Sequence, residues 1–357
     1  MVSRVVPRAL LRAAAAADES SDTVPIVVGS VAGALILLAL ATTVYLCSKR
    51  RCHRAKSTLV DSTCDDASHY ELSADVDVSE NLEWGLLQRL DAADVQTTRQ
   101  LATGVYYNVW EGAYDGATVF VKALVPKRQT LTHMQCFLDT LNVASACVHP
   151  CILGVLGAAW SQPLVARSRS TLVGVLEHMD LGSMRTVLMA SNMYNLAWHD
   201  KLSCILDMAS ALAYLHSRCV IHGAFNTKNI ILDSTKRAKL ANVGLSRVEI
   251  LSGIAPGVWW VAPEMLTAGQ SSPAIDVYAF GRVLVELDTH RRPSRHLTLT
   301  NETIQHIVTE ESTSPRFTSM CPDWIQDLAL LCIARKPEAR PSAATILAVV
   351  RSQLDMM

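Results

Sequence analysis

The polar side chains best placed to do chemistry lie in one short stretch, Val220–Leu232, which reads VIHGAFNTKNIIL. His222 and Asn229 stand seven residues apart in a polar loop that enters the apolar run Ile-Ile-Leu. Ala224 carries only a methyl group, which cannot accept a proton. The stretch therefore offers the imidazole of His222 and the carboxamide of Asn229 for chemistry, but only a methyl group at position 224.

The elements around this loop are expected to form a strand-rich half followed by a helical half. Alternation of apolar and polar residues predicts strands early in the chain, with a turn signal at Asp115-Gly116. After Gly182 apolar residues recur at three- and four-residue spacing, which predicts helices. The expected strands lie in Val105–Leu124, Ile152–Ala158 and Thr171–Glu177, and the expected helices are His133–Cys147, Leu202–Ser217, Trp324–Ala334 and Ala343–Leu354.

The overall composition excludes several kinds of partner. The net charge is −1 over 357 residues, so no global field favours nucleic acid or an acidic substrate. The ten cysteines include no C-x-x-C pair, and this scatter fits reduced thiols better than a disulfide framework. Cys147, His149 and Cys151 lie close together but lack the fourth ligand of a structural zinc site. We therefore expect neither nucleic acid binding nor a metal at this cluster.

One apolar segment near the N-terminus is long enough to cross a membrane. Residues 25–47 carry no charged side chain over 23 residues. As a helix they would reach roughly 35 Å, against a hydrocarbon core of about 30 Å. A buried soluble helix or a signal peptide is the other interpretation, and length and flanks favour the membrane span. Gly29 and Gly33 form a G-x-x-x-G motif, which would let two such helices approach closely in a homodimer.

The flanks of this segment set the expected topology. Basic residues crowd its C-terminal side, and positive flanks stay cytoplasmic. We therefore expect a single-pass membrane protein with residues 1–24 as a short extracytoplasmic tail and the rest of the chain after the span in the cytoplasm. Residues 48–84 are expected to be a basic juxtamembrane segment and an acidic, solvated linker. The basic residues are Lys49, Arg50, Arg51, His53, Arg54 and Lys56, and the acidic ones are Asp61, Asp65, Asp66, Glu71, Asp75, Asp77 and Glu80.

From about residue 85 the chain resembles protein kinases of the tyrosine-kinase-like group. Together with the membrane span, it is similar to the membrane-anchored kinases of that group that oomycetes encode. The resemblance implies a two-lobed α+β kinase fold over residues 85–357, with a small β-rich N-lobe at about 90–177 and a larger helical C-lobe at about 178–355. Five motifs carry it, in the order of the family: His149-Pro150-x-Ile152, Glu177-His178-Met179 with Gly182-Ser183, Val261–Glu264 (A-P-E), Asp276–Gly281 (D-V-Y-S-F-G), and Cys332 through Arg340-Pro341.

The resemblance implies that four residues serve the fold. Glu264 is expected to pair with Arg340 in a buried ion pair, whose disruption could cost about 3–5 kcal/mol. Asp276 is expected to accept backbone hydrogen bonds from the loop around His222. These anchors are all present in the sequence.

The resemblance also implies a nucleotide site, in which Lys122 would reach the phosphates. Of the three loop glycines only Gly104 remains, because Ala102 and Tyr107 stand at the other positions. Phe120 occupies the position of a small alanine above the adenine, where its ring would fill the space of the base. Alternatively, the ring turns into the core of its own lobe. The nucleotide-binding positions, if the function is retained, are Gly104, Val109, Lys122, Glu177, Met179 and Asn229.

Three groups that phosphoryl transfer uses are replaced. Ala224 stands at the position of the base, and Thr140 stands where the helix glutamate that pairs with the lysine is expected. Asn242 replaces the aspartate of the D-F-G motif. Asn229 and Asn242 therefore supply only neutral oxygens to a magnesium ion, which prefers carboxylates.

The sequence thus predicts a membrane-anchored pseudokinase, a signalling or scaffolding module without efficient phosphoryl transfer. Its expected partners are the membrane and other kinases or signalling proteins, and no cofactor is required. The alternative is a weak protein kinase that uses ATP and magnesium through Lys122 and Asn229.

Overall fold

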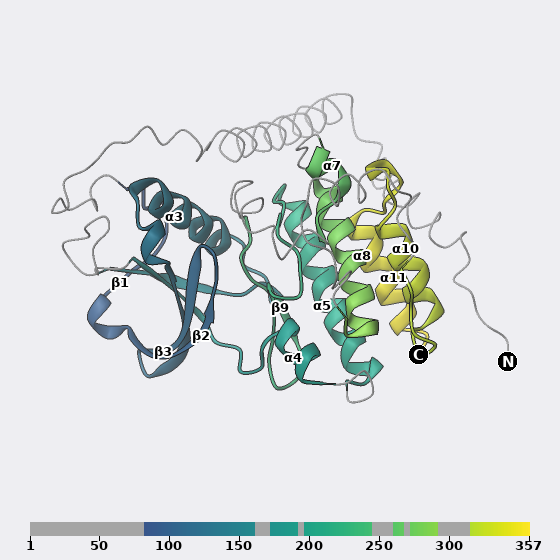
Figure 1. Ribbon diagram of the computed structural model, residues 1–357, viewed down its shortest axis with the longest axis horizontal. Coiled ribbons are helices and arrows are strands. Elements are labelled where there is room, and N and C mark those ends of the chain that lie inside the picture. Colours follow the sequence, from purple (N-terminus) through teal and green to yellow (C-terminus); the bar gives the residue numbers. More distant parts are fainter. Residues whose placement is uncertain (1–81, 161–171, 192–195, 245–259, 268–271, 292–314) are drawn as a thin grey trace, which may run out of the picture.

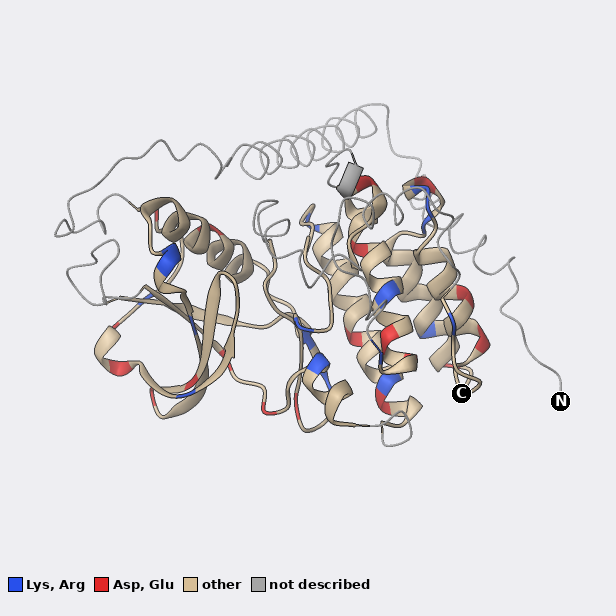
Figure 2. Ribbon diagram, viewed as in Figure 1, with Lys and Arg blue, Asp and Glu red and all other residues tan. Residues whose placement is uncertain are grey.

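The chain forms a small sheet lobe followed by a larger helical lobe (Figure 1). This arrangement confirms the two-lobed kinase fold expected from the order of the sequence motifs. Positive and negative side chains are interspersed over both lobes in the described part of the chain (Figure 2). The computed structural model describes residues 82–160, 172–191, 196–244, 260–267, 272–291 and 315–357.

The N-lobe is built on a six-stranded sheet with the order β1-β5-β6-β4-β3-β2. Its strand pairs are antiparallel, apart from the parallel pair of β1 and β5. The β3–β4 hairpin closes at Asp115 and Gly116, whose φ angles of 48° and 74° suit a two-residue loop. The strands are β1 (Arg89–Leu90), β2 (Gln96–Thr103), β3 (Tyr107–Tyr114), β4 (Ala117–Leu124), β5 (Val155–Ala159) and β6 (Val173–Glu177).

The long helix α3 (Leu131–Ala146) packs against this sheet. The side chain of Thr130 caps it by accepting a hydrogen bond from the His133 N–H. Gly174 of β6 allows the close approach, because a Cβ there would lie 2.9 Å from the Leu141 side chain. The helix turns a row of side chains into the N-lobe core, and this row comprises Met134, Phe137, Leu138, Thr140, Leu141 and Ala144.

The C-lobe is a helical bundle. Helix α5 (Trp198–Ser217) packs on α11 (Ala343–Leu354), and α8 (Pro273–Thr289) packs on α10 (Asp323–Cys332) (Figure 1). Apolar side chains from α5, α8 and α10 fill the interior. The shorter helices of the C-lobe are α4 (Met184–Ala190), α7 (Pro263–Thr267) and the 3-10 helix η5 (Pro337–Ala339), and those of the N-lobe are the 3-10 helices η2 (Ala92–Asp94) and η3 (Pro126–Arg128).

A small sheet with the order β7-β8-β9 brings two loops of the candidate site together. In the β8–β9 hairpin Ile230 pairs with Leu240, so the residues just before β8 lie beside those just after β9. The Ala241 N–H accordingly donates to the Asn229 carbonyl at 2.8 Å. The strands are β7 (Gly182–Ser183), β8 (Ile230–Leu232) and β9 (Ala238–Leu240).

The predicted membrane span, residues 25–47, lies outside the described residues, as do residues 1–24 and most of the linker. Within the described ranges, no helix combines the length and the apolar character needed to cross a membrane. The span therefore stays a prediction from the sequence.

Candidate functional site

A cavity of about 1060 Å³ lies between the two lobes. On the N-lobe side it is lined by the β2–β3 turn and β4, and on the C-lobe side by the loop before β8 and the turn after β9. Glu177 and Met179 do not line it. The residues singled out from the sequence that do line it include Ala102, Gly104, Tyr107, Val109, Phe120, Lys122, Ala224, Asn229, Asn242 and Asp276.

Asp276 of α8 fixes the loop at the floor of this cavity. One of its oxygens accepts hydrogen bonds from the His222 N–H at 2.8 Å and from His216 Nε2 at 2.9 Å, and the other accepts one from the Gly223 N–H at 2.9 Å. Asp276 is 1% exposed, so these bonds compensate a carboxylate that burial would otherwise penalise. Asp276 therefore holds the backbone of the loop in place.

His222 acts as a buried support of the same loop. Its Nε2–H donates to the Ala241 carbonyl at 3.1 Å, and its Nδ1 accepts from the Ala224 N–H at 3.2 Å. Complete burial lowers the pKa of His222 below its ordinary value, because a charged ring would be desolvated. The neutral ring thus links the two loops that carry Ala224 and Asn242.

Three hydrogen bonds join the remaining polar residues of the cleft into one chain. Lys122 Nζ donates to Asn242 Oδ1, and Asn242 Nδ2 donates to Asn229 Oδ1, both at 2.8 Å. Asn229 Nδ2 in turn donates to the Ala224 carbonyl at 2.8 Å. Asn242 has a φ of 63°, a conformation that asparagine tolerates better than most residues.

These three hydrogen bonds leave a set of oxygen ligands that does not fit magnesium. The two amide oxygens that would meet the ion each accept an internal hydrogen bond, from Lys122 and from Asn242. Neither oxygen carries a negative charge, and a hard cation prefers carboxylates. The described residues also contain no group of three or more histidine, cysteine or acidic side chains able to hold a metal.

The side chain of Lys122 is enclosed between the sheet and α3. It is 5% exposed, and its Nζ lies 3.8 Å from the centroid of the Tyr107 ring and 5.6 Å from that of Phe137. Such contacts stabilise a cation over an aromatic face. Thr140, the residue at the glutamate position of α3, turns its hydroxyl back to the Cys136 carbonyl at 2.9 Å. The tyrosine at a lost glycine position therefore covers the lysine that would reach the phosphates.

Gly104 is retained for a local reason. Its N–H donates to the Tyr107 carbonyl at 2.8 Å and closes the β2–β3 turn. A Cβ at position 104 would lie 2.8 Å from the same carbonyl oxygen, closer than real Cβ contacts allow. The turn itself therefore requires this glycine.

Phe120 of β4 fills the inner end of the cleft. The residue is 7% exposed, so its ring lies in the cluster between the lobes. His178, in the segment that links them, lies against it with ring centroids 4.7 Å apart. Of the two orientations considered from the sequence, the ring takes the one toward the cavity and not the one into the core of its own lobe. The residues of the cluster are Val109, Phe120, Leu153, Val155, Leu176, Met179, Ile231 and Ala241.

Glu177, the last residue of β6, makes its contacts outside the cavity lining. Its carboxylate bonds Lys239 Nζ at 2.7 and 2.8 Å and accepts the Gly154 N–H at 2.6 Å. The Glu177 N–H donates to the Gly154 carbonyl at 3.0 Å. The Glu177 side chain therefore braces the segment that links the lobes.

The ion pair expected between Glu264 and Arg340 is present. The guanidinium donates to both carboxylate oxygens, at 2.6 and 2.9 Å. It also donates to the carbonyls of Ala274, Ala334 and Arg335, and the Arg340 side chain is fully buried. This bidentate pair holds α7 against the C-terminal helices.

A second buried pair was not foreseen from the sequence. Arg185 of α4 bonds Glu286 of α8, which is completely buried, and Arg185 also lines the cavity. Burial raises the pKa of Glu286, against the opposing effect of Arg185. Glu286 interrupts the apolar run Val283–Leu287 of α8, and this interruption is the sequence signal that could have indicated the pair.

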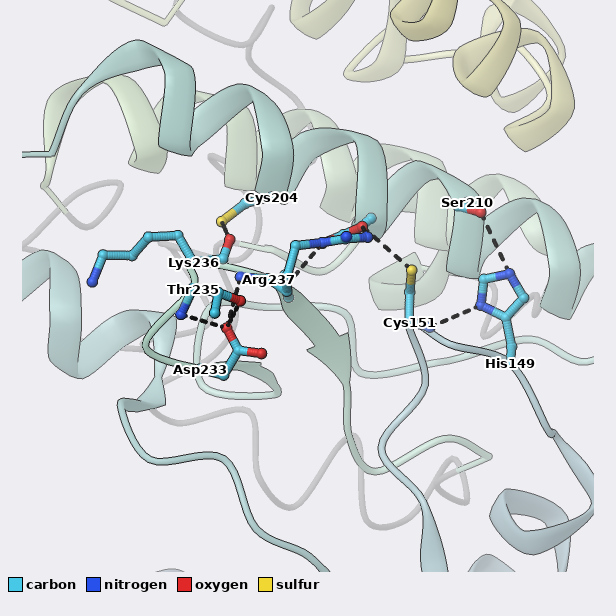
Figure 3. Close-up of polar contacts among 10 residues, drawn as sticks. His149, Cys151, Cys204, Ser210, Asp233, Thr235, Lys236 and Arg237 are labelled. Atoms are coloured by element: carbon cyan, nitrogen blue, oxygen red, sulfur yellow. Dashed lines mark hydrogen bonds and ion pairs between the residues drawn. The ribbon is translucent and has the colours of Figure 1, made fainter.

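Of the three residues considered for a metal, His149 and Cys151 belong to a hydrogen-bonded network beside α5 (Figure 3). His149 Nδ1 accepts from the Cys151 N–H at 3.1 Å, and His149 Nε2 lies 3.4 Å from Ser210 Oγ. The Cys151 thiol donates to Asp207, which Arg237 also binds. Burial raises the pKa of Cys151 to about 11, so its thiol stays protonated at neutral pH. The group serves to join α5 to the β8–β9 hairpin.

Comparison with known proteins agrees with this architecture. The family model for protein tyrosine and serine/threonine kinases matches residues 95–350. The serine/threonine/tyrosine-protein kinase HT1 of Arabidopsis thaliana is 28% identical over 268 residues, which cover 73% of this chain and 66% of that protein. Two probable serine/threonine-protein kinases of Dictyostelium discoideum are 27% and 28% identical, over 70% and 72% of this chain.

These relatives are longer proteins. The chain spans slightly less than two thirds of the Arabidopsis kinase and 23% and 16% of the two Dictyostelium kinases. The matched region nevertheless takes in both lobes, from β2 to α11. By this match, the chain belongs to the protein tyrosine and serine/threonine kinase family.

Proposed function

We propose that this protein is a membrane-anchored pseudokinase of the tyrosine-kinase-like group, which acts by binding other proteins. The observation that carries the proposal is the hydrogen-bonded chain from Lys122 through Asn242 and Asn229 to the Ala224 carbonyl. In this series of bonds the neutral residues Ala224 and Asn242 stand at the positions at which a kinase needs a base and a charged metal ligand.

The size of the chemical deficit supports the proposal. Phosphoryl transfer depends on positioning and on electrostatic stabilisation by the lysine, its glutamate, two metal ligands and the base. If each lost group contributed about 3 kcal/mol in the transition state, each loss would slow transfer by more than a hundredfold. Such effects are not additive, but three losses around one pocket are incompatible with efficient catalysis.

The alternative is a weak kinase that binds ATP with magnesium through Lys122 and Asn229. The observation in its favour is that a cavity of about 1060 Å³ persists between the lobes and that both residues line it. Against it, the Lys122 ammonium lies under the Tyr107 ring, and Phe120 fills the inner end of the cleft.

Thermal unfolding of the full chain with ATP, with and without magnesium, separates the two functions. The pseudokinase proposal expects no magnesium-dependent stabilisation and no transfer of radiolabel to a general protein substrate. Stabilisation that requires magnesium, with transfer that is lost in Lys122→Ala, would establish the weak kinase instead.

A repaired variant tests the reason for the deficit. In Ala224→Asp/Asn242→Asp the new carboxylate at 242 cannot donate to Asn229, so the Asn229 oxygen becomes available to a cation. We expect this variant to gain magnesium-dependent stabilisation by ATP once Phe120 is also replaced by alanine. No gain in the triple variant would mean that the deficit lies elsewhere in the cleft.

The cellular setting is part of the same proposal. The uncharged segment 25–47 and the basic residues after it support a single span with the kinase domain in the cytoplasm. The partners we propose are other kinases or signalling proteins, with dimerisation through Gly29 and Gly33. We expect the protein to resist alkaline extraction from membranes and an N-terminal tag to be accessible to protease on intact cells. We expect crosslinked dimers to be lost in Gly29→Leu/Gly33→Leu, which tests the helix–helix contact.

A further inference from the structure

The loop that carries Ala224 presents small and apolar residues to the cavity between the lobes. Gly223, Ala224 and Phe225 all line this cavity. Ala224 is half-buried, and its methyl group stands where the family has the carboxylate of the base. A molecule that reaches this part of the cavity therefore meets a methyl group and no charge at position 224.

An apolar wall continues from this loop to the helices α7 and α8. Val261, Ala262, Met265 and Ile275 line the cavity. They belong to one apolar cluster, which also contains Ile221 of the same loop. We call these four lining residues the apolar wall. The C-lobe side of the cavity thus offers a connected apolar surface beside the site of the missing base.

The N-lobe side of the cavity is apolar at its mouth. Leu101 of β2 and Val105 of the β2–β3 turn line the cavity and are 39% and 52% exposed. Exposed apolar surface that borders a cavity is a frequent mark of a binding site. An occupant that covers these two side chains has to extend out of the cavity, as a segment of a protein does.

The polar residues of the cavity have already satisfied one another's hydrogen bonds. Lys122 donates to Asn242, Asn242 donates to Asn229, and Asn229 donates to the Ala224 carbonyl. Asp276 accepts three hydrogen bonds from the loop and from α5. Covering a polar group is costly mainly when the group loses its partners. An apolar occupant can therefore exclude water here without leaving these groups unpaired.

The charged residues around the cavity favour an uncharged occupant. Arg99 pairs with Glu111 at 2.8 Å, and Arg185 pairs with the buried Glu286. Lys228 lines the cavity but is exposed, so water solvates its ammonium group. A charged ligand would have to displace an internal partner or compete with water, whereas an uncharged one does neither.

We propose that the cavity holds an apolar side chain of a partner protein, leucine or phenylalanine, presented on an uncharged segment. This side chain lies against Ala224 and the apolar wall, where a kinase holds the hydroxyl group of its substrate. The inference rests on the proposed function as a protein-binding module and names the chemistry of the partner. The same hydrogen bonds that leave no ligand for magnesium make the cleft suitable for an apolar anchor.

The test measures the binding of labelled peptides to the full chain. The probes are fluorescein-labelled peptides of glycine, serine and threonine that differ only in the central residue, which is leucine, phenylalanine, serine, aspartate or lysine. Fluorescence anisotropy gives the Kd of each peptide. From the burial of one such side chain, we expect the leucine and phenylalanine peptides to bind about ten- to a hundredfold more tightly than the serine peptide.

Two variants of the cavity test where the apolar side chain binds. Ala224→Asp places a carboxylate against the anchor and should reduce the preference for leucine over serine by about tenfold or more. Thr132→Asp adds the same charge at an exposed position of α3 outside the cavity, so it is the matched control and should keep the preference. Val105→Ser, at an exposed position of the mouth, should weaken only the leucine and phenylalanine peptides, also if Ala224→Asp does not fold.

Four outcomes would overturn the proposal: equal affinity of all the peptides, no binding of any, tightest binding of the aspartate or lysine peptide, or an unchanged preference in both cavity variants. None of them bears on phosphoryl transfer, which the experiment with ATP and magnesium tests by itself. The two proposals can therefore fail separately.

Discussion

Replacing Phe120 by alanine is the most direct test of how the cleft is closed. A buried Phe→Ala substitution costs about 3–5 kcal/mol. The cost here should lie near 3 kcal/mol, because the space left by the ring opens into the 1060 Å³ cavity and fills with water. At about 2–4 °C per kcal/mol for a domain of this size, the midpoint of thermal unfolding should fall by roughly 6–12 °C.

The same substitution should create a site for adenine. With the ring absent, adenosine can enter between Val109 and Ile231, which pack in the cluster around Phe120. At a concentration of about 100 times its Kd, adenosine would restore about 2.7 kcal/mol, nearly the whole loss. Adenosine is the suitable probe because it needs neither magnesium nor Lys122.

The assay is thermal unfolding of wild type and Phe120→Ala over a range of adenosine concentrations. Phe137→Ala is the matched control: Phe137 is completely buried in the same lobe, but it does not line the cavity. It should lose stability without a response to adenosine. Equal stabilisation of wild type and Phe120→Ala, or none in either, would refute the explanation that Phe120 closes the site.

Three further predictions concern the scaffold of the site. Arg340→Lys should lower the free energy of unfolding by about 3 kcal/mol in urea titrations. Lysine cannot bind Glu264 in bidentate fashion, and it leaves backbone carbonyls that Arg340 binds without a partner. A loss below about 1 kcal/mol would contradict this prediction. Asp276→Asn should cost about 2 kcal/mol and speed hydrogen exchange in residues 220–229, since an amide group turns a donor toward an N–H; unchanged exchange there would count against the anchoring role. The pKa of His222 is lowered in the folded state, so the unfolded state binds a proton more readily as the pH falls. The free energy of unfolding should therefore be retained above about pH 6.5 and should fall below it by up to about 1.4 kcal/mol per pH unit. Urea titrations at several pH values should show a shallower fall in His222→Gln.

The sequence pattern predicted most elements that have one buried face. The alternation over 105–124 with its Asp-Gly turn corresponds to β3 and β4, and the expected final helix, Ala343–Leu354, has the bounds of α11. Strand β2 (Gln96–Thr103) was not predicted. All eight of its residues are exposed, so no apolar alternation marks it, and its pairing with β3 alone makes it a strand.

The candidate site was predictable in its residue types but not in its contacts. The substitutions at 224 and 242 can be read from the motifs, because family spacing assigns each position a role. The hydrogen bond between Lys122 and Asn242 joins residues 120 positions apart in the sequence. No local sequence pattern indicates which group a buried amide will bind. Likewise, the position of Tyr107 over Lys122 depends on the register of β3 with β4 and on the packing of α3.

The sequence by itself determined the fold, the missing base and the missing charges, because these depend on which side chain stands at each motif position. It also contains the uncharged segment 25–47, from which the membrane span is predicted. Only the tertiary structure decided how the remaining polar groups are used. Lys122, Asn242 and Asn229 come from distant segments, and burial forces them to satisfy one another's hydrogen bonds once they are brought together.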